Sequence, residues 1–379
     1  MKNIIKRWLL ITILLQTICC QKALETKAFA AIHKNEITHA KGFSIHKYGN
    51  YSILKVTNPW PNASQSYTYI LKRKGAIIPD SLSKFATISV PVKKIIVTST
   101  THIPSLEMLG VEKSLIGFPN LEYISSPNVR ARIDAGYVRE VGSTQNLNTE
   151  IILNLGPDLI VAHGIDNNNP ALDNLERSGL KVMMNGDWNE QTALGKAEWI
   201  KFFGALYGLD EKAKTIFGTI QTEYEKTIKL ASSAKQKPTV LSGAIYENHW
   251  YLPQGDSWGA LLIAQAGGNY LWKETKGTGS LSLSVESVLE RAENANFWIG
   301  PGQFTTLAEM GDANPHYKRF AAFRNKSVYS YSIKKGPTGG IIYFELAPNR
   351  PDLVIKDLVK IFHPELLPDH QLYFFEKVN

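Results

Sequence analysis

The sequence predicts an α/β protein: two α/β lobes with mostly parallel sheets, joined by a single long backbone helix, plus an N-terminal β-hairpin extension. Three observations lead to this fold class. Short apolar runs alternate with helical segments from about residue 92 onward, which is typical of parallel sheets. Between residues 209 and 234 this alternation gives way to a long apolar stripe at helical spacing. The same glutamate–helix–strand pattern occurs once on either side of that stripe.

The first 19 residues have the pattern of a signal peptide. Basic residues precede an almost unbroken apolar run over residues 8–18, which is too short to span a bilayer. The run ends at Cys19 and Cys20, a position typical of bacterial lipoproteins, so we expect cleavage before Cys20 and a lipid on its sulfur. Ordinary cleavage after Ala30 is the alternative. Either site predicts a location in the periplasm or cell envelope, and the first adds a lipid anchor to a membrane.

Composition and charge exclude several classes of protein. The chain has 379 residues, of which 44% are hydrophobic and 20% charged, so two folded domains fit and wholesale disorder does not. A mean hydropathy of −0.16 excludes a polytopic membrane protein. The net charge of +8 is scattered without an arginine-rich block, so no nucleic-acid partner is expected. Because no cysteine follows Cys20, the folded lobes are expected to lack a structural disulfide.

Residues 20–91 are predicted to form a tether and a β-hairpin extension. Residues 21–47 are polar and show no repeating pattern, which indicates a tether. Residues 48–58 and 66–72 alternate between polar and apolar side chains, as the two strands of a hairpin do.

The N-terminal α/β lobe is predicted over residues 92–208. Strands are expected at residues 95–97, 115–118, 159–162 and 182–184, with helices at 102–109, 149–155 and 171–177. Because strands that alternate with helices run parallel, their carboxyl ends should meet at one edge of the sheet.

The linking helix is predicted over residues 209–235. Its apolar stripe consists of Ala213, Ile216, Phe217, Ile220, Tyr224, Ile228 and Ala231. A helix of this span is about 39 Å long, which is too long for a crossover in a small sheet and suits a bridge between lobes.

The C-terminal α/β lobe is predicted over residues 236–379. Its strands are expected at residues 239–241, 245–252, 297–299 and 328–331, and its helices at 258–266, 285–291 and 352–362.

Each lobe contains a glutamate in the first turn of a short helix that leads into a buried strand. Glu150 opens the first such helix and Glu286 the second. One such glutamate would commonly do no more than complement the helix dipole, at about 0.3–1 kcal/mol. Recurrence at the same place in two lobes indicates a shared role.

With these features the chain resembles the periplasmic substrate-binding proteins of ABC importers for iron complexes and cobalamin. The resemblance covers about residues 92–365, and the paired glutamate–helix–strand segments are its most specific part. It implies a rigid helix between the lobes and a ligand in the cleft, either an iron complex (siderophore or haem) or a corrinoid such as cobalamin. It also implies that Glu150 and Glu286 dock onto arginines of an ABC permease. Such a protein is not an enzyme and has no catalytic residue, resident metal or cofactor.

The ligand is expected to contact loops that face the cleft. The candidates in the N-terminal lobe are Thr101, His102, Tyr123, Ser143, Gln145 and His163. Those in the C-terminal lobe are Trp250, Trp258, Tyr270, Ser280 and Gln303, with Arg350 for an anionic group of the ligand. Core packing is the alternative role for each tryptophan, and a surface charge at a helix start is the alternative for Arg350.

A secreted serine esterase is one alternative function. The segment Gly255-Asp256-Ser257-Trp258-Gly259 matches the Gly-x-Ser-x-Gly nucleophile elbow. The partners would be Asp352 or Asp357 and then His363 or His370, in the Ser–Asp–His order of the chain. Pro253 in the preceding strand and the lack of an oxyanion His-Gly-Gly run argue against this reading.

Two further alternatives rest on fewer residues. His102, His163 and His249 are candidates for holding a bare divalent metal ion, but a closed site needs three or four converging ligands and the chain has no His-rich loop. The N-terminal hairpin alone motivates a surface adhesin or scaffold.

Overall fold

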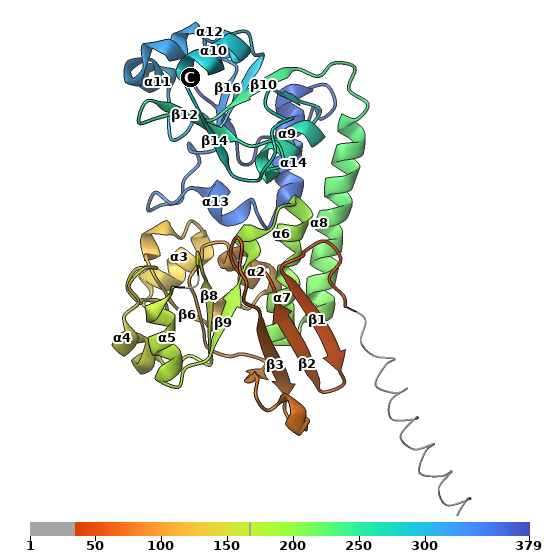
Figure 1. Cartoon of the computed structure of the whole chain (residues 1–379), viewed down its shortest axis with the longest axis vertical. Helices are drawn as coiled ribbons and strands as arrows, with labels where there is room; N and C mark the ends of the chain where they lie inside the picture. The colour runs from red at the N-terminus through yellow and green to blue at the C-terminus, as the bar shows by residue number, and fades with distance from the viewer. Residues whose placement is uncertain (1–34, 167) are drawn as a thin grey trace, which may run out of the picture.

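The computed structural model describes residues 35–166 and 168–379, which form two α/β lobes linked along one side by a long helix (Figure 1). The predicted signal peptide and Cys20 lie outside the described residues. Within the described part, no helix combines the length and the apolar character needed to cross a membrane.

The N-terminal lobe contains a five-stranded sheet in the order β7-β6-β5-β8-β9, with every neighbouring pair parallel. Its strands are β5 (Ile95–Val97), β6 (Leu115–Phe118), β7 (Arg139–Glu140), β8 (Leu159–His163) and β9 (Val182–Asn185). Its helices include α2 (His102–Leu109), α3 (Pro127–Asp134), α4 (Thr149–Leu155) and α5 (Pro170–Arg177). Strand β5 is buried along its whole length, as expected for a parallel sheet covered on both faces.

The extension before this lobe is a four-stranded sheet, so the expected tether over residues 21–47 is wrong in its described part. The strands are β1 (Phe43–Tyr48), β2 (Tyr51–Val56), β3 (Tyr67–Arg73) and β4 (Ala86–Val90), in that order. The predicted hairpin is present as the antiparallel pair β2–β3. Strand β1 escaped notice because only Phe43 and Ile45 alternate within a polar segment, and both are buried in the core of the N-terminal lobe.

Two short helices that the sequence did not reveal lead from the N-terminal lobe to the linking helix. These are α6 (Ala193–Glu198) and α7 (Ile200–Tyr207), and all of α7 except Lys201 is buried. A helix that is apolar on all sides lacks amphipathic periodicity, so the sequence pattern does not identify it. Gly208, with φ of 67°, ends α7 in the left-handed conformation.

The linking helix α8 (Asp210–Ala231) is one unbroken helix of 22 residues, as predicted. At 1.5 Å per residue it is about 33 Å long. Its buried side chains are those of Ala213, Phe217, Ile220, Tyr224, Thr227 and Ala231. It packs against α7 in the N-terminal lobe and against α14 (Pro351–Phe362) in the C-terminal lobe, and so spans both lobes (Figure 1).

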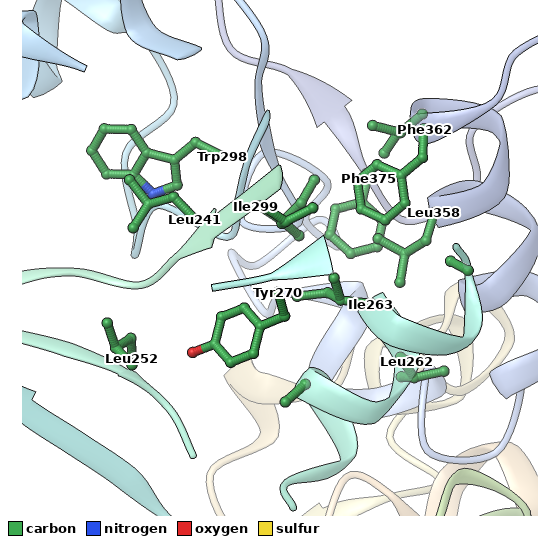
Figure 2. Close-up of a cluster of buried hydrophobic side chains, with 14 of the residues drawn as sticks. Leu241, Leu252, Leu262, Ile263, Tyr270, Trp298, Ile299, Leu358, Phe362 and Phe375 are labelled. Carbon is green, nitrogen blue, oxygen red and sulfur yellow. The ribbon is translucent and has the colours of Figure 1, made fainter. Parts of the chain in front are cut away.

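The C-terminal lobe has a five-stranded sheet in the order β13-β10-β15-β16-β17, in which only β17 is antiparallel to its neighbour. The strands are β10 (Thr239–Ser242), β13 (Asn269–Tyr270), β15 (Phe297–Ile299), β16 (Val328–Ser330) and β17 (Glu376–Lys377). The helices are α9 (Trp258–Gln265), α10 (Val285–Ala292), α11 (Leu307–Ala313), α12 (Ala321–Arg324) and α13 (Ile342–Leu346), followed by α14. Figure 2 shows the hydrophobic core between this sheet and α9 and α14.

A second, antiparallel sheet in this lobe corrects the strand expected at residues 245–252. The segment forms two strands, β11 (Ala244–Tyr246) and β12 (His249–Pro253), and β12 also pairs with β14 (Ser280–Leu283). Glu247 and Asn248 make the turn, with φ of 46° and 70°. A two-residue turn with both φ values positive usually carries Asn-Gly or Asp-Gly, so the sequence Glu-Asn did not predict a hairpin turn here.

Candidate functional site

A cavity of about 890 Å³ opens in the C-terminal lobe, and we call it the C-lobe cavity. It lies where the chain leaves the carboxyl ends of β10, β15 and β16, at Ser242, Gly300 and Tyr331, beside the β11–β12 hairpin. Its lining residues are Ser242, Gly243, Ala244, Ile245, Tyr246, Tyr251, Leu252, Pro253, Ser257, Trp258, Gly259, Thr278, Gly279, Ser280, Gly300, Gly302, Gln303, Phe304 and Tyr331. In parallel α/β sheets this is the edge at which ligands bind.

Two glycines shape the backbone at this edge of the sheet. Gly243 has φ of 81°, and a Cβ atom there would lie 1.9 Å from the carbonyl oxygen of Tyr251. Gly300 has φ of 69°, and its Cβ would lie 2.9 Å from the ring of Tyr331. Both positions therefore require glycine for the conformation and for the close approach.

Aromatic side chains form much of the wall of the C-lobe cavity. Tyr246 and Tyr251 stand on the β11–β12 hairpin with ring centroids 6.2 Å apart. Tyr331 stacks on Tyr343 of α13 at 4.4 Å. Such rings offer flat apolar surface at a low cost in conformational entropy, which suits ligand binding.

A smaller cavity of about 260 Å³, which we call the N-lobe cavity, lies at the carboxyl edge of the other sheet. Its lining residues are Thr98, Ser99, Thr100, Phe118, Pro119, Tyr123, Thr144, His163, Gly340, Ile341 and Phe344. The last three come from the C-terminal lobe, at the start of α13 and before it, and α13 lies between the lobes in Figure 1. This cavity is therefore a space between lobes.

His163 is the one titratable imidazole on the wall of the N-lobe cavity. Its backbone N–H donates to the hydroxyl of Thr98 at 2.9 Å, which fixes the end of β8 next to β5. Its Nδ1 is buried without a partner. Burial lowers the pKa of His163, although Asp187 opposes the shift, so the ring is neutral at pH 7 and can act as an electron-pair donor.

His102 does not line a cavity, which corrects its assignment to the cleft. The side chain is fully buried, 5.5 Å from the ring of Phe203, with Nε2 4.0 Å from Oδ1 of Asp187. Burial lowers the pKa of His102 to about 4, more than the attraction of Asp187 raises it. It belongs to a buried polar cluster with Asp187 and Asn185 rather than to the ligand surface.

Contacts across the cleft hold α13 against the N-terminal lobe. The carboxylate of Glu345 accepts hydrogen bonds from the backbone N–H groups of Ser125 and Ser126, at 2.6 and 3.0 Å. Asn349 accepts from the hydroxyl of Ser105 and donates to the carbonyl of Thr101, both at 2.8 Å. Burial raises the pKa of Glu345 to about 7, against the lowering effect of the bond from Ser125.

Five of the predicted ligand residues line a cavity. Tyr123 and His163 line the N-lobe cavity, and Trp258, Ser280 and Gln303 line the C-lobe cavity.

Three other predicted residues lie beside the N-lobe cavity without lining it. Ser143 and Gln145 flank Thr144, which does line the N-lobe cavity, and form a tight turn with it. Thr101 shares a hydrogen bond with Ser99 through their hydroxyls, at 2.8 Å. The hydroxyls of Thr101 and Ser143 are both engaged in hydrogen bonds within these loops.

Trp250 and Tyr270 belong to the core, which corrects their assignment to the cleft. Trp250 is fully buried, 5.1 Å from the ring of Trp298, and its indole N–H donates to the carbonyl of Ser242. Tyr270 is also fully buried and lies among apolar side chains in Figure 2, with its hydroxyl donating to Pro253. Because side chains alternate along β12, the cavity receives Tyr251, the neighbour of Trp250.

Arg350 is committed to an ion pair rather than to a ligand. Its guanidinium makes two hydrogen bonds to the carboxylate of Asp352, at 2.9 and 2.8 Å, at the start of α14. This bidentate pairing uses the groups that would recognise an anion.

The site residues that sequence reasoning missed fall into two groups. Thr98, Ser99 and Thr100 follow directly after a predicted strand, so the strand-end rule alone would have found them. Others depended on elements that were not predicted. These are Tyr246 and Tyr251 on the β11–β12 hairpin and Phe344 on α13.

Neither alternative site assembles in the described part of the chain. Ser257 uses its hydroxyl to accept from the N–H of Ala260 as the cap of α9, and it makes no hydrogen bond to a histidine in the described part of the chain. His370 and Asp357 do pair, at 2.7 Å, but the other oxygen of Asp357 is occupied by backbone N–H groups near the C-terminus. Nor does any group of three or more described His, Cys, Asp or Glu side chains form a metal site.

Glu150 and Glu286 are both exposed in the first turn of their helices. The side chain of Asn148 caps α4, and that of Ser284 caps α10. Because these cap side chains accept from backbone N–H groups at the helix starts, the two glutamate carboxylates are not needed as caps.

Comparison with known proteins identifies relatives over most of the chain. A family model described as "Periplasmic binding protein" matches residues 95–333. An uncharacterized lipoprotein of Methanocaldococcus jannaschii is 27% identical over 325 residues, 82% of this chain and 76% of its own. A second uncharacterized lipoprotein of that organism is 25% identical over 357 residues, 91% of this chain and 87% of its own.

Solved structures show the same fold at lower identity. A periplasmic haem-binding protein from Pseudomonas aeruginosa has a TM-score of 0.57 at 18% identity, covering 76% of this chain and 98% of its own. A periplasmic vitamin B12-binding protein of Vibrio cholerae has a TM-score of 0.52 at 14% identity, covering 74% and 99%. A possible iron-binding periplasmic protein from Staphylococcus epidermidis has a TM-score of 0.55 at 19% identity, covering 72% and 99%.

Proposed function

The chain belongs to the periplasmic binding protein family, and we propose that it is the substrate-binding component of an ABC transporter. It captures an iron complex (a siderophore or haem) or cobalamin between its lobes and delivers it to the membrane permease. The observation that carries this proposal is the pair of cavities at the carboxyl edges of both sheets, the smaller of which is lined by residues from both lobes. The similar structures named for iron, haem and vitamin B12 support the same ligand class.

The architecture supports capture without a large closing motion. Helix α8 runs continuously from one lobe to the other, and α13 is hydrogen-bonded to the N-terminal lobe through Glu345. A continuous helix has no hinge of the loop type, so the lobes are expected to move by small amounts. A preformed site also spends little binding energy on ordering loops.

The residues proposed to hold the ligand are those that reach the cavities. Tyr123 and His163 face it from the N-terminal lobe, and Trp258, Ser280 and Gln303 from the C-terminal lobe. The neutral imidazole of His163 is a suitable electron-pair donor for the metal centre of a bound chelate.

Glu150 and Glu286 are proposed to dock onto permease arginines. Their exposure at the start of two capped helices, one in each lobe, supports this role. Charge-assisted hydrogen bonds to arginine contribute about 1.5–3 kcal/mol each. Because exposed charge pairs are screened, docking should weaken as salt increases.

A lipid on Cys20 would keep the protein beside its permease in the cell envelope. The two relatives named as lipoproteins support this localisation.

The test is titration of the purified protein with haem, ferric siderophores and cobalamin. Binding is measured by the quenching of tryptophan fluorescence and by absorbance. We expect saturable binding of one chelate per protein, which also colours the protein. We also expect no hydrolysis of short acyl esters. Ester hydrolysis that Ser257→Ala abolishes, together with no binding of any chelate, would contradict the proposal.

A further inference from the structure

We infer that the ligand is a large metal complex without net charge, such as a corrinoid or a ferric trihydroxamate, rather than an anionic complex such as haem or a ferric tris-catecholate. The inference rests on the proposed function and narrows it. The observation that carries it is the lack of formal charge on the walls of both cavities.

No charged side chain lines either cavity in the described chain. The nineteen residues of the C-lobe cavity and the eleven of the N-lobe cavity include no lysine, arginine, aspartate or glutamate. His163 is neutral at pH 7 because burial lowers its pKa. An anionic group placed between these walls would lose water without gaining a full positive charge in return, which is costly.

Three basic side chains in the elements around the cavities are bound to other parts of the protein. Arg350 is paired with Asp352. Lys196 lies 5.5 Å from the ring of Trp258, but its ammonium group is buried and donates to the carbonyl of Trp188 at 2.6 Å. Lys334 donates to the carbonyl of Leu372. Recruiting any of them for a ligand would leave a buried acceptor without its partner.

Helix dipoles do not replace these missing cations. The first turn of α9 reaches the C-lobe cavity at Trp258 and Gly259, and α2 begins close to Thr100 of the N-lobe cavity. Each helix start carries about half a positive elementary charge, so the two together supply about one. Haem presents two carboxylates and a ferric tris-catecholate three negative charges, so about one positive charge cannot pair with every anionic group of either ligand.

What the walls do offer is aromatic surface and uncharged hydrogen-bonding groups. Of the six exposed tyrosine and phenylalanine side chains in the described residues, four line the two cavities, namely Tyr123, Tyr246, Tyr251 and Phe344. Hydroxyls and one amide stand between them, at Ser280, Thr278 and Gln303 among others. Aromatic faces bind flat or aliphatic ligand surfaces, and hydroxyls and amides pair with ligand amide or hydroxamate oxygens.

The size of the C-lobe cavity agrees with this class. Its 890 Å³ lies near the upper end of the range for small-molecule sites, before the N-lobe cavity is added. A corrinoid edged with amides and a folded trihydroxamate are both large enough to use it.

The test is a series of probes that differ in charge: cyanocobalamin, ferrichrome, haemin and a ferric tris-catecholate. Dissociation constants are measured by tryptophan quenching at low and high salt. We expect one of the two uncharged probes to bind at least about ten-fold more tightly than either anionic probe. We also expect its affinity to change less than about two-fold with salt, since no charge pair forms. Which uncharged probe binds separates a corrinoid from a hydroxamate.

A matched pair of variants adds a cation to the wall. Gln303→Lys should raise the affinity for haemin about ten-fold, since a charge-assisted bond becomes available, whereas Gln303→Met should not. Tightest binding of an anionic probe by the natural protein would overturn the inference and leave the proposed function standing. Binding of no probe would overturn the proposed function and the inference with it.

Discussion

The carboxylate of Glu345 on α13 accepts a hydrogen bond of 2.6 Å from the backbone N–H of Ser125, in the other lobe. The second oxygen of Glu345 accepts from Ser126. These bonds fix the segment that carries Ile341 and Phe344, and with it one wall of the N-lobe cavity. The shape of the cleft therefore depends on a buried carboxylate.

Glu345→Gln is predicted to change the pH dependence of stability. Burial raises the pKa of Glu345 to about 7 from a value of 4.5 in the unfolded chain. The folded protein therefore binds the proton more tightly between these values, so the contribution of Glu345 falls as pH rises from 4.5 through 7. The free energy of unfolding of the natural protein, minus that of the variant, should fall by up to about 3 kcal/mol over this range. Denaturant unfolding at a series of pH values measures it, and a constant difference would contradict the account.

His102→Gln is predicted to act in the opposite direction. Burial lowers the pKa of His102 from 6.5 to about 4, so the unfolded chain binds the proton more tightly. The stability that the neutral ring supports is complete above pH 6.5 and is lost as pH falls through 4. The natural protein should lose up to about 3 kcal/mol relative to the variant over that interval. The same unfolding series decides it, and parallel curves would show that His102 titrates normally.

The regular elements of both lobes could be predicted from the sequence because their patterns are local. A short-range sequence pattern is enough to identify the buried strands β5, β8 and β15 and the apolar stripe of α8. The β11–β12 hairpin could not be predicted, because Glu247 and Asn248 are an unusual pair of turn residues. Helix α7 could not either, because it is buried almost all round.

The candidate site was predicted in part, from residues at strand ends and in the loops that follow predicted strands. His163 ends β8, and the strand-end rule located it. Trp250 and Tyr251 differ by one position, and the direction of each side chain follows from the pairing of β12, which the sequence did not reveal. The contact between Glu345 and Ser125 joins residues 220 positions apart and has no local signature.

Trp250→Ala and Tyr251→Ala are predicted to separate the core from the cavity. Trp250→Ala removes a fully buried ring and should cost about 3–5 kcal/mol of unfolding free energy. Tyr251→Ala removes a side chain that is 41% exposed, so it should cost within about 1 kcal/mol while weakening chelate binding about three- to ten-fold. Urea unfolding and ligand titration on both variants measure these effects. The reverse pattern would place the ligand against Trp250.

Ser257→Ala is predicted to lower the stability of the fold. Its hydroxyl caps α9 by accepting from Ala260, and loss of such a cap costs about 1 kcal/mol. Ser257→Asn is the matched control, since asparagine caps equally well and should retain that stability. Thermal unfolding distinguishes the two. An equal loss of stability in both variants would mean that the Ser257 hydroxyl stabilises the fold by something other than capping α9.

The central claim is that the protein delivers its ligand to a permease, and a charge reversal at the proposed docking residues tests it most directly. Ligand affinity and cellular uptake are measured on the same variant, Glu150→Lys with Glu286→Lys. The control is Glu211→Lys with Glu290→Lys, which changes net charge equally at two other exposed glutamates. We predict that the docking variant binds ligand normally but loses uptake, while the control keeps both. Full uptake with both docking charges reversed would contradict the account.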